Sequence, residues 1–166
     1  TFVARGVDVF GAHLEDVITK ASAHKGTAVV EIYQNCNIFN DGAYKGFTEK
    51  EVRDARILYL THGQPLLWGP NKDQGIAFDA QFRPYLVRGA DLGKAYVWDE
   101  TAETPAPAMA LATMNETEFP VPVGVFRRRE KPAFESGVQA QITAAKAKKK
   151  ESLRDLLYAG EIWDVK

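Results

Sequence analysis

The order of hydrophobic and polar positions in the first third of the chain predicts a strand, a helix and a second strand. Residues 2–4 form an apolar run that predicts the end of a buried strand. Apolar residues then recur at helical spacing, at Leu14, Val17, Ile18 and Ala21. Asp8 is the candidate N-cap of this helix, and Gly26 is its stop. Residues 27–33 are nearly continuously apolar, which is typical of a strand covered on both faces in a parallel sheet. A right-handed crossover places both strands in one sheet, with the loop after residue 33 at its carboxyl edge.

Glycine and proline residues interrupt the apolar pattern after residue 41, so the middle of the chain predicts loop-rich packing of short elements. These are a helix over residues 49–56, strands over 57–60, 83–87 and 95–98, and a helix over 108–114 that follows Thr104 and Pro105. Pro120 and Pro122 lack the N–H groups that a central strand donates. Residues 119–124 therefore predict an edge segment or a connector.

The end of the chain predicts two helices. Residues 137–150 are rich in Ala, Gln and Lys, which favours a solvated helix over an anion-binding patch. Leu153, Leu156 and Leu157 lie on one face of a second helix. With Ile162 and Trp163 they form an apolar anchor that can dock on the body of the protein or on another subunit.

Composition narrows the class of protein. The hydrophobic content of 45% in 166 residues fits a globular domain with its own core. The net charge of -1 gives no field that favours nucleic acid or an anionic membrane, so small ligands or protein partners are expected. A single cysteine excludes an internal disulfide, and no apolar run approaches the roughly 20 residues that span a bilayer. The cytoplasm is the expected compartment, and the apolar start at Thr1 predicts a chain cut within a fold.

Cys36, the one cysteine, is the main candidate for chemistry, because it follows an apolar strand and precedes a polar loop that ends at Gly42. From the residues alone it is buried filler, a metal ligand or a nucleophile. His13, His24 and His62 show no chelating spacing with it, and His13 and His24 are expected at the surface. His62 lies in a Gly/Pro turn, where it could pair with Cys36 in a cysteine hydrolase. The chain holds no GxGxxG, Walker or GxSxG motif.

Two further charged positions carry expectations. Glu31 interrupts an apolar strand, so it needs either a cationic partner or an edge position. Residues 127–131 (RRREK) form a charge cluster, for which solvated strand-end side chains are favoured over a phosphate contact. Asp99 and Glu100 are uninformative alone.

Five segments together resemble the β subunit of bacterial 2-oxoacid:ferredoxin oxidoreductases, and in particular the 2-oxoglutarate type. They are residues 1–6 (TFVARG), 30–41 (VEIYQNCNIFND), 62–66 (HGQPL), 123–127 (VGVFR) and 156–163 (LLYAGEIW). The resemblance runs in order through essentially the whole chain and matches the C-terminal half of that subunit. It implies an α/β fold in which residues 1–45 end a parallel-sheet domain that binds thiamine diphosphate. Residues 46–166 are then a loop-rich C-terminal extension.

The resemblance also implies a reaction and its partners. The thiamine ylide attacks the keto carbon of a 2-oxoacid, carbon dioxide leaves, and coenzyme A takes the acyl group. Electrons pass singly through a 4Fe-4S cluster to ferredoxin. The α subunit completes the active site, and Mg²⁺ accompanies thiamine diphosphate.

In that family the fourth cysteine ligand of the cluster follows a late strand of the thiamine domain, and Cys36 matches this position. The interpretation of Cys36 therefore moves from filler to cluster ligand. The other three cysteines and the Gly-Asp-Gly motif that contacts diphosphate and magnesium are absent from this chain, so by itself it is expected to be inactive. The alternative hypothesis is a non-catalytic interaction module that docks through its C-terminal Leu/Trp helix.

Overall fold

The computed structural model describes residues 1–148, 152–163 and 165. The chain divides into two compact units, Thr1–Lys131 and Pro132–Lys166. Each unit is described by itself. The family-derived domain boundary at residue 45 stays a prediction.

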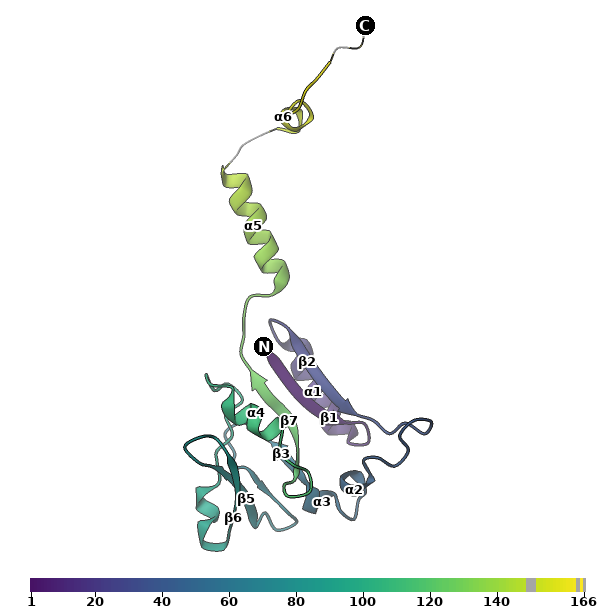
Figure 1. Ribbon diagram of the computed structural model, residues 1–166, viewed down its shortest axis with the longest axis vertical. Coiled ribbons are helices and arrows are strands. Elements are labelled where there is room, and N and C mark those ends of the chain that lie inside the picture. The colour runs from purple at the N-terminus through teal and green to yellow at the C-terminus, as the bar shows by residue number, and fades with distance from the viewer. Residues whose placement is uncertain (149–151, 164, 166) are drawn as a thin grey trace. The chain divides into compact units, whose positions relative to one another are not determined.

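The first unit is built on a four-stranded sheet in the order β2-β1-β7-β3 (Figure 1). β1 (Phe2–Val7) and β2 (Ala28–Tyr33) run parallel and are joined by α1 (Gly11–Ala23), as the sequence pattern predicts. β7 (Val121–Arg128) pairs antiparallel with β1 and parallel with β3 (Ile57–Leu60). The predicted α/β class is therefore confirmed, but the sheet is mixed because the β1–β7 pairing is antiparallel.

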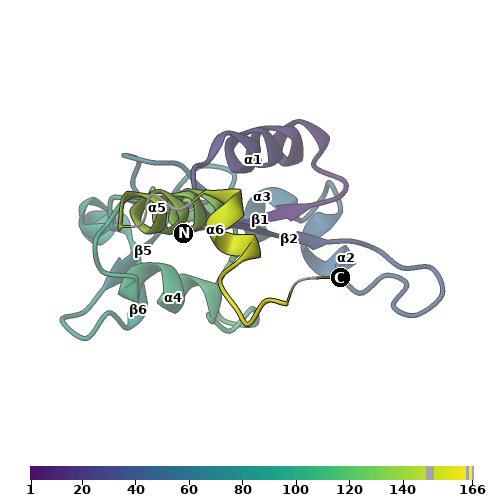
Figure 2. The same ribbon diagram turned by 90° about the horizontal axis from the view of Figure 1, so that it is seen from above.

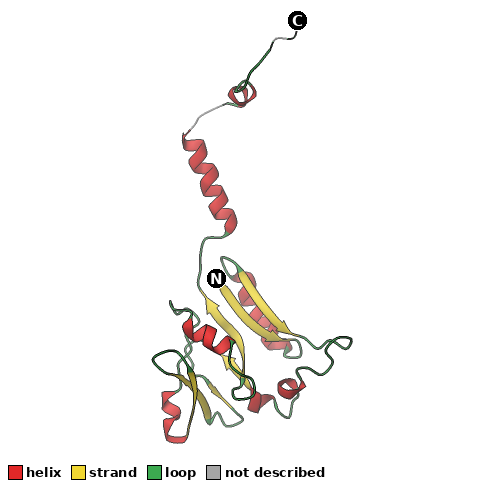
Figure 3. Ribbon diagram, viewed as in Figure 1, coloured by secondary structure: helices red, strands yellow, loops and turns green. Residues whose placement is uncertain are grey.

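Short elements fill the middle of the chain (Figure 3). A second, antiparallel sheet has the order β4-β5-β6, with β4 (Leu67–Trp68), β5 (Gln74–Phe78) and β6 (Pro84–Arg88). The helices are α2 (Lys45–Thr48), α3 (Arg53–Arg56), the 3-10 helix η1 (Gly89–Lys94) and α4 (Ala106–Ala112). Of the helix predicted over residues 49–56, only the last turn forms, as α3. The strand predicted over residues 95–98 is reduced to a single bridge between Pro65 and Val97.

Helices cover both faces of the larger sheet, and Figure 2 shows α1 on one side and α4 on the other. Because side chains alternate along a strand, neighbouring residues of β7 serve different cores. Val125 packs with Val17 of α1 and Phe2, whereas Phe126 packs with Leu111 of α4. The apolar residues of one strand thereby hold two layers together.

The prediction that residues 119–124 avoid a central strand is wrong, because β7 lies between β1 and β3. The reason is that the two pairings of β7 are offset along its length. Pro122 is aligned with Leu58 of β3, whereas the pairing with β1 begins only at Gly124. Pro122 therefore needs no donor toward β1, and its missing N–H costs no hydrogen bond there.

β2 is one of the two edge strands of the sheet. It was predicted to be covered on both faces, and it is not. Val29 and Ile32 are 56% and 43% exposed although both are strongly apolar. Glu31 satisfies both of its expected conditions, since it lies on this edge and its Oε2 accepts from Nε of Arg5 at 2.7 Å. Continuity of apolar residues thus predicted the strand but not its environment.

The second unit holds α5 (Phe134–Lys148) and α6 (Leu153–Leu157). Neither helix contains a buried residue, which agrees with the predicted solvated helix, although the expected end of that helix at residue 150 lies outside the described residues. Ser152 and Asp155 form a capping box that begins α6. In the part of the chain that the structure describes, no helix has the length and apolar character needed to cross a membrane.

Candidate functional site

The Cys36 loop lies where the sequence places it, at the carboxyl ends of β1 and β2. Cys36 and Asn40 form an antiparallel bridge, in which the amide of Asn40 donates to the carbonyl of Cys36 at 2.9 Å. A cleft of about 230 Å³ adjoins the loop and is lined by Asp8, Asn35, Lys45, Glu49 and their neighbours. The loop is therefore a folded turn at the ligand-binding edge of the sheet.

The thiol of Cys36 is partly exposed and sits in a turn that favours its thiolate form. The amide of Phe39 donates to Sγ at 3.5 Å. The backbone amides of Phe39, Ile38 and Asn40 lower the pKa of Cys36 against the opposing effect of burial. A thiolate that receives N–H groups is the form of cysteine that binds a metal or attacks an electrophile.

Asn35 holds this turn together with its side-chain amide. Its Oδ1 accepts from the amide of Gly42 at 2.8 Å, and its Nδ2 donates to Asn37 at 2.8 Å and to Asp41 at 3.0 Å. Asp8 fixes the start of the loop, because its Oδ2 accepts from the amide of Asn35 at 3.1 Å. The prediction that Asp8 caps α1 is wrong, since that helix starts after Phe10 without a side-chain cap.

We expect Asn35→Ala to loosen the Cys36 loop without unfolding the sheet. The amide of Gly42 loses its acceptor, so its hydrogen exchange should accelerate by about tenfold or more, measured by NMR. Asn37→Ala is the matched control, because Asn37 contributes one contact and leaves the bond to Gly42 in place. Equal exchange at Gly42 in both variants would contradict this role of Asn35.

The structure does not bring Cys36 and His62 together as the hydrolase hypothesis requires. Nδ1 of His62 lies 3.5 Å from the Asp99 carboxylate, and no hydrogen bond joins His62 to Cys36 among the described residues. Within the same residues, no group of three His, Cys, Asp or Glu side chains is placed to hold a metal ion. The role of Cys36 as a cluster ligand therefore stays a prediction.

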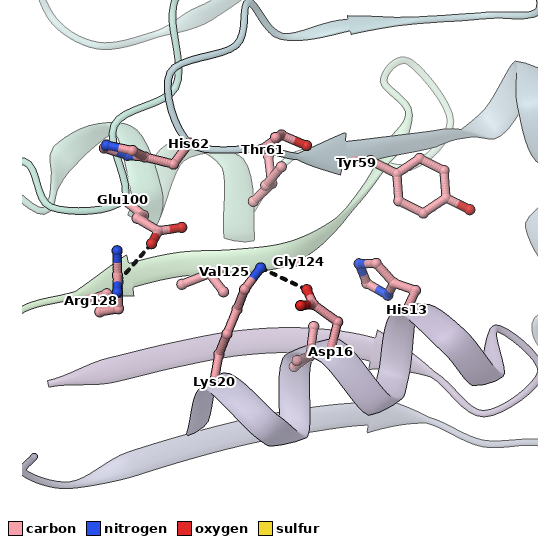
Figure 4. Close-up of a pocket in the computed structure, with 12 residues that line it drawn as sticks. His13, Asp16, Lys20, Tyr59, Thr61, His62, Glu100, Gly124, Val125 and Arg128 are labelled. Atoms are coloured by element: carbon pink, nitrogen blue, oxygen red, sulfur yellow. Dashed lines mark hydrogen bonds and ion pairs between the residues drawn. The ribbon is translucent and has the colours of Figure 1, made fainter. Parts of the chain in front are cut away.

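A second and larger cleft, of about 460 Å³, lies beneath α1 (Figure 4). Polar side chains from four separate segments line it: His13, Asp16 and Lys20 of α1, Tyr59, Thr61 and His62 at the end of β3, Glu100, and Arg128 of β7. His62 faces a cleft as its turn suggested, but the prediction that His13 is an ordinary surface residue is wrong. Helical spacing alone did not reveal the partly buried side of α1 on which His13 lies.

Glu100 is a functional candidate that sequence reasoning missed. Its side chain is only 7% exposed, and its Oε1 lies 2.7 Å from Nε of Arg128. The other arginines of the charge cluster bind the same loop, since Arg127 donates to the carbonyls of Ala102 and Glu103 and Arg129 donates to that of Thr101. Arg128 is solvated as expected, with a side chain that is 47% exposed, but all three arginines also hold the loop after Trp98 against the sheet.

Removing the partner of a buried charge is costly, so we expect Arg128→Met to lower the free energy of unfolding by about 2 kcal/mol. Chemical denaturation followed by circular dichroism measures the loss. Lys94→Met is the control, because its ion pair with Asp91 is about two-thirds exposed and such pairs contribute little to stability. Equal losses in the two variants would refute the distinction.

The surroundings of His13 favour its neutral form. Burial lowers its pKa, and the Lys20 ammonium adds to this effect, whereas the Asp16 carboxylate opposes it. Its Nδ1 is buried without a hydrogen-bond partner among the described residues. Its ring meets Tyr59 edge-on, with ring centroids 5.3 Å apart.

A depressed histidine pKa makes stability depend on pH in a defined direction. The unfolded chain binds a proton at His13 near pH 6.5 and the folded chain does so only at lower pH, so stability falls as pH drops from about 7 toward 5. We expect His13→Gln to flatten this part of the pH profile of the unfolding free energy. An unchanged slope in the variant would mean that His13 does not contribute.

No family model matches the chain. Among curated proteins, it is 30% identical over 171 aligned positions to the 2-oxoglutarate oxidoreductase subunit KorB of Mycobacterium tuberculosis. This alignment covers 99% of this chain and 45% of that protein. It is 42% identical over 52 residues to the β subunit of a 2-oxoacid:ferredoxin oxidoreductase from Saccharolobus solfataricus, covering 31% of this chain and 17% of that protein. A β subunit from a Sulfolobus species is 40% identical over 60 residues, covering 36% of this chain and 18% of its own. The chain thus spans less than half the length of the relatives that it matches.

Proposed function

Because the chain is homologous to the β subunits of 2-oxoacid:ferredoxin oxidoreductases, we propose that it forms the C-terminal part of such a subunit, of the 2-oxoglutarate type. The proposed reaction is the oxidative decarboxylation of a 2-oxoacid to acyl-coenzyme A, with ferredoxin as electron acceptor. The observation that carries this proposal is the alignment over 99% of the chain with a 2-oxoglutarate oxidoreductase subunit. A match of this extent is harder to explain by chance than any single motif.

In this proposal Cys36 is one of four cysteine ligands of a 4Fe-4S cluster, which supplies single-electron transfer when it is bound. The turn around Cys36 supports the role, because backbone amides that favour the thiolate also donate to a metal-bound sulfur. Asn35 and Asp8 hold the loop that carries the sulfur. Residues outside this chain supply the other three thiolates.

Thiamine diphosphate and Mg²⁺ are proposed for the complete subunit, in the domain that residues 1–45 are expected to end. The strand-helix-strand unit at the start of the chain is suited to such a domain, because its two parallel strands present their carboxyl ends together. The remainder, 46–166, is the proposed extension. A cytoplasmic location, favoured by the single cysteine, stays a prediction.

Contact with the α subunit is proposed for the second unit of the chain. Leu153, Leu156 and Leu157 of α6 are each about 70% exposed, and Trp163 is 83% exposed. Apolar side chains gathered so densely on a short segment are typical of protein contact surfaces. The same observation supports the alternative function, a non-catalytic module that docks through this helix.

The proposal is tested with the complete β subunit copurified with its α subunit in the absence of oxygen. We expect reduction of ferredoxin that requires both 2-oxoglutarate and coenzyme A. The isolated 166-residue chain is expected to show no turnover. Turnover by the isolated chain, or an assembled pair that reduces ferredoxin with neither substrate nor coenzyme A present, would refute the assignment.

A further inference from the structure

The cleft beneath α1 is separate from the proposed cluster ligand, and no function has so far been given to it. Its volume of about 460 Å³ lies within the usual range for small-molecule sites. It shares no lining residue with the cleft beside the Cys36 loop. Four segments that are far apart in the sequence bring their polar side chains into it.

Two side chains in the cleft keep hydrogen-bonding capacity that the described residues do not use. Nδ1 of His13 is buried and has no partner among the described residues, and leaving a buried polar atom unpaired is costly. Nε of Arg128 forms the ion pair with Glu100, and no hydrogen bond or ion pair among the described residues occupies its two terminal nitrogens. A bound molecule that supplies partners to these groups would recover part of that cost.

The charges of the cleft are balanced, and they form two ion pairs, Lys20 with Asp16 at 2.6 Å and Arg128 with Glu100 at 2.7 Å. Glu100 and Arg128 lie at one end, Asp16 and Lys20 follow, and His13 and Tyr59 lie at the other end (Figure 4). Two carboxylates would repel a phosphate group, so the two cations do not make an anion site. A molecule that carries one positive and one negative charge fits such a cleft better.

We propose that this cleft binds a zwitterionic small molecule of the α-amino acid class. The terminal nitrogens of Arg128 receive its carboxylate, because a guanidinium fork matches a carboxylate in a bidentate manner. Glu100, which lies beside Arg128, receives its ammonium group. The ligand side chain lies toward His13, Tyr59 and Thr61, which can exchange hydrogen bonds with a neutral polar group.

Isothermal titration calorimetry of the 166-residue chain with L-glutamine tests the proposal. Its amide can both donate to and accept from the groups at the His13 end. Two analogues each lack one charge: glutaramate has no ammonium group, and 4-aminobutanamide has no carboxylate. We expect millimolar or tighter binding of L-glutamine and at least about tenfold weaker binding of each analogue. Absence of L-glutamine binding, or equal binding of an analogue, would overturn the proposal.

A substitution locates the site. Arg128→Lys keeps the positive charge beside Glu100 but removes the fork, so L-glutamine should bind about tenfold more weakly. Arg127→Lys is the matched control, since Arg127 is the preceding residue of β7 and does not line the cleft. NMR of the unmodified chain gives an independent measurement. L-Glutamine should shift the imidazole resonances of His13 and leave those of His24 in place, and the reverse result would place the ligand elsewhere.

Discussion

We expect Trp98→Ala to lower the free energy of unfolding by about 4 kcal/mol, the largest effect of any substitution considered for the first unit. Trp98 is 1% exposed and packs in the cluster that joins the smaller sheet to the larger one, with Leu58, Ile76 and Phe126. Its indole Nε1 donates to the carbonyl of Val125 at 3.0 Å. Alanine would leave a large cavity and a carbonyl without its donor at the same point.

Urea denaturation followed by circular dichroism measures this loss. Trp163→Ala is the matched control, because Trp163 is 83% exposed and its removal should change stability by less than about 0.5 kcal/mol. A loss below about 1 kcal/mol for Trp98→Ala would show that the two sheets do not depend on this side chain for their cohesion.

The second large effect is expected for Gly124→Ala, at about 3 kcal/mol. Gly124 has φ of +117°, which side chains other than hydrogen rarely allow. A Cβ atom there would lie 2.9 Å from the carbonyl oxygen of Leu60. The pairing of β7 with β3 therefore has to open, or the backbone of β7 has to shift.

Gly11→Ala is the control for this substitution. Gly11 opens α1, and a Cβ atom there meets no other atom within 4 Å. Alanine favours a helix over glycine, so the control should leave stability unchanged or raise it by up to about 1 kcal/mol. If Gly124→Ala were equally harmless, the close approach of β7 to β3 would be refuted.

The sequence predicted best where local pattern and tertiary environment agree. β1, α1 and β2 follow from apolar spacing, and the position of Cys36 at a strand end follows from them. Pro122 shows the limit, because proline argues against a central strand only if both sides of the strand are paired at that residue. The offset between the two pairings of β7 is a tertiary property that no local pattern encodes.

The cleft beneath α1 could not be predicted from the sequence, for a related reason. His13, Glu100 and Arg128 are separated by many residues and share no motif, so only the packing of α1 on β7 makes them neighbours. A weak signal existed in the RRREK segment, whose first arginines alternate across a strand. Recognising the pair with Glu100 required the fold of the loop after Trp98.

The central claim, that Cys36 binds the cluster of an oxidoreductase β subunit, is tested most directly by metal analysis. The complete β subunit with its α subunit, purified without oxygen, is compared as the Cys36→Ser variant, an Asn37→Ser control and the unmodified protein. Iron and acid-labile sulfide are quantified, and electron paramagnetic resonance of the reduced protein reports the cluster. We predict loss of iron, sulfide and the cluster signal in Cys36→Ser and their retention in Asn37→Ser. Full iron and sulfide content in the Cys36→Ser protein would contradict the ligand role.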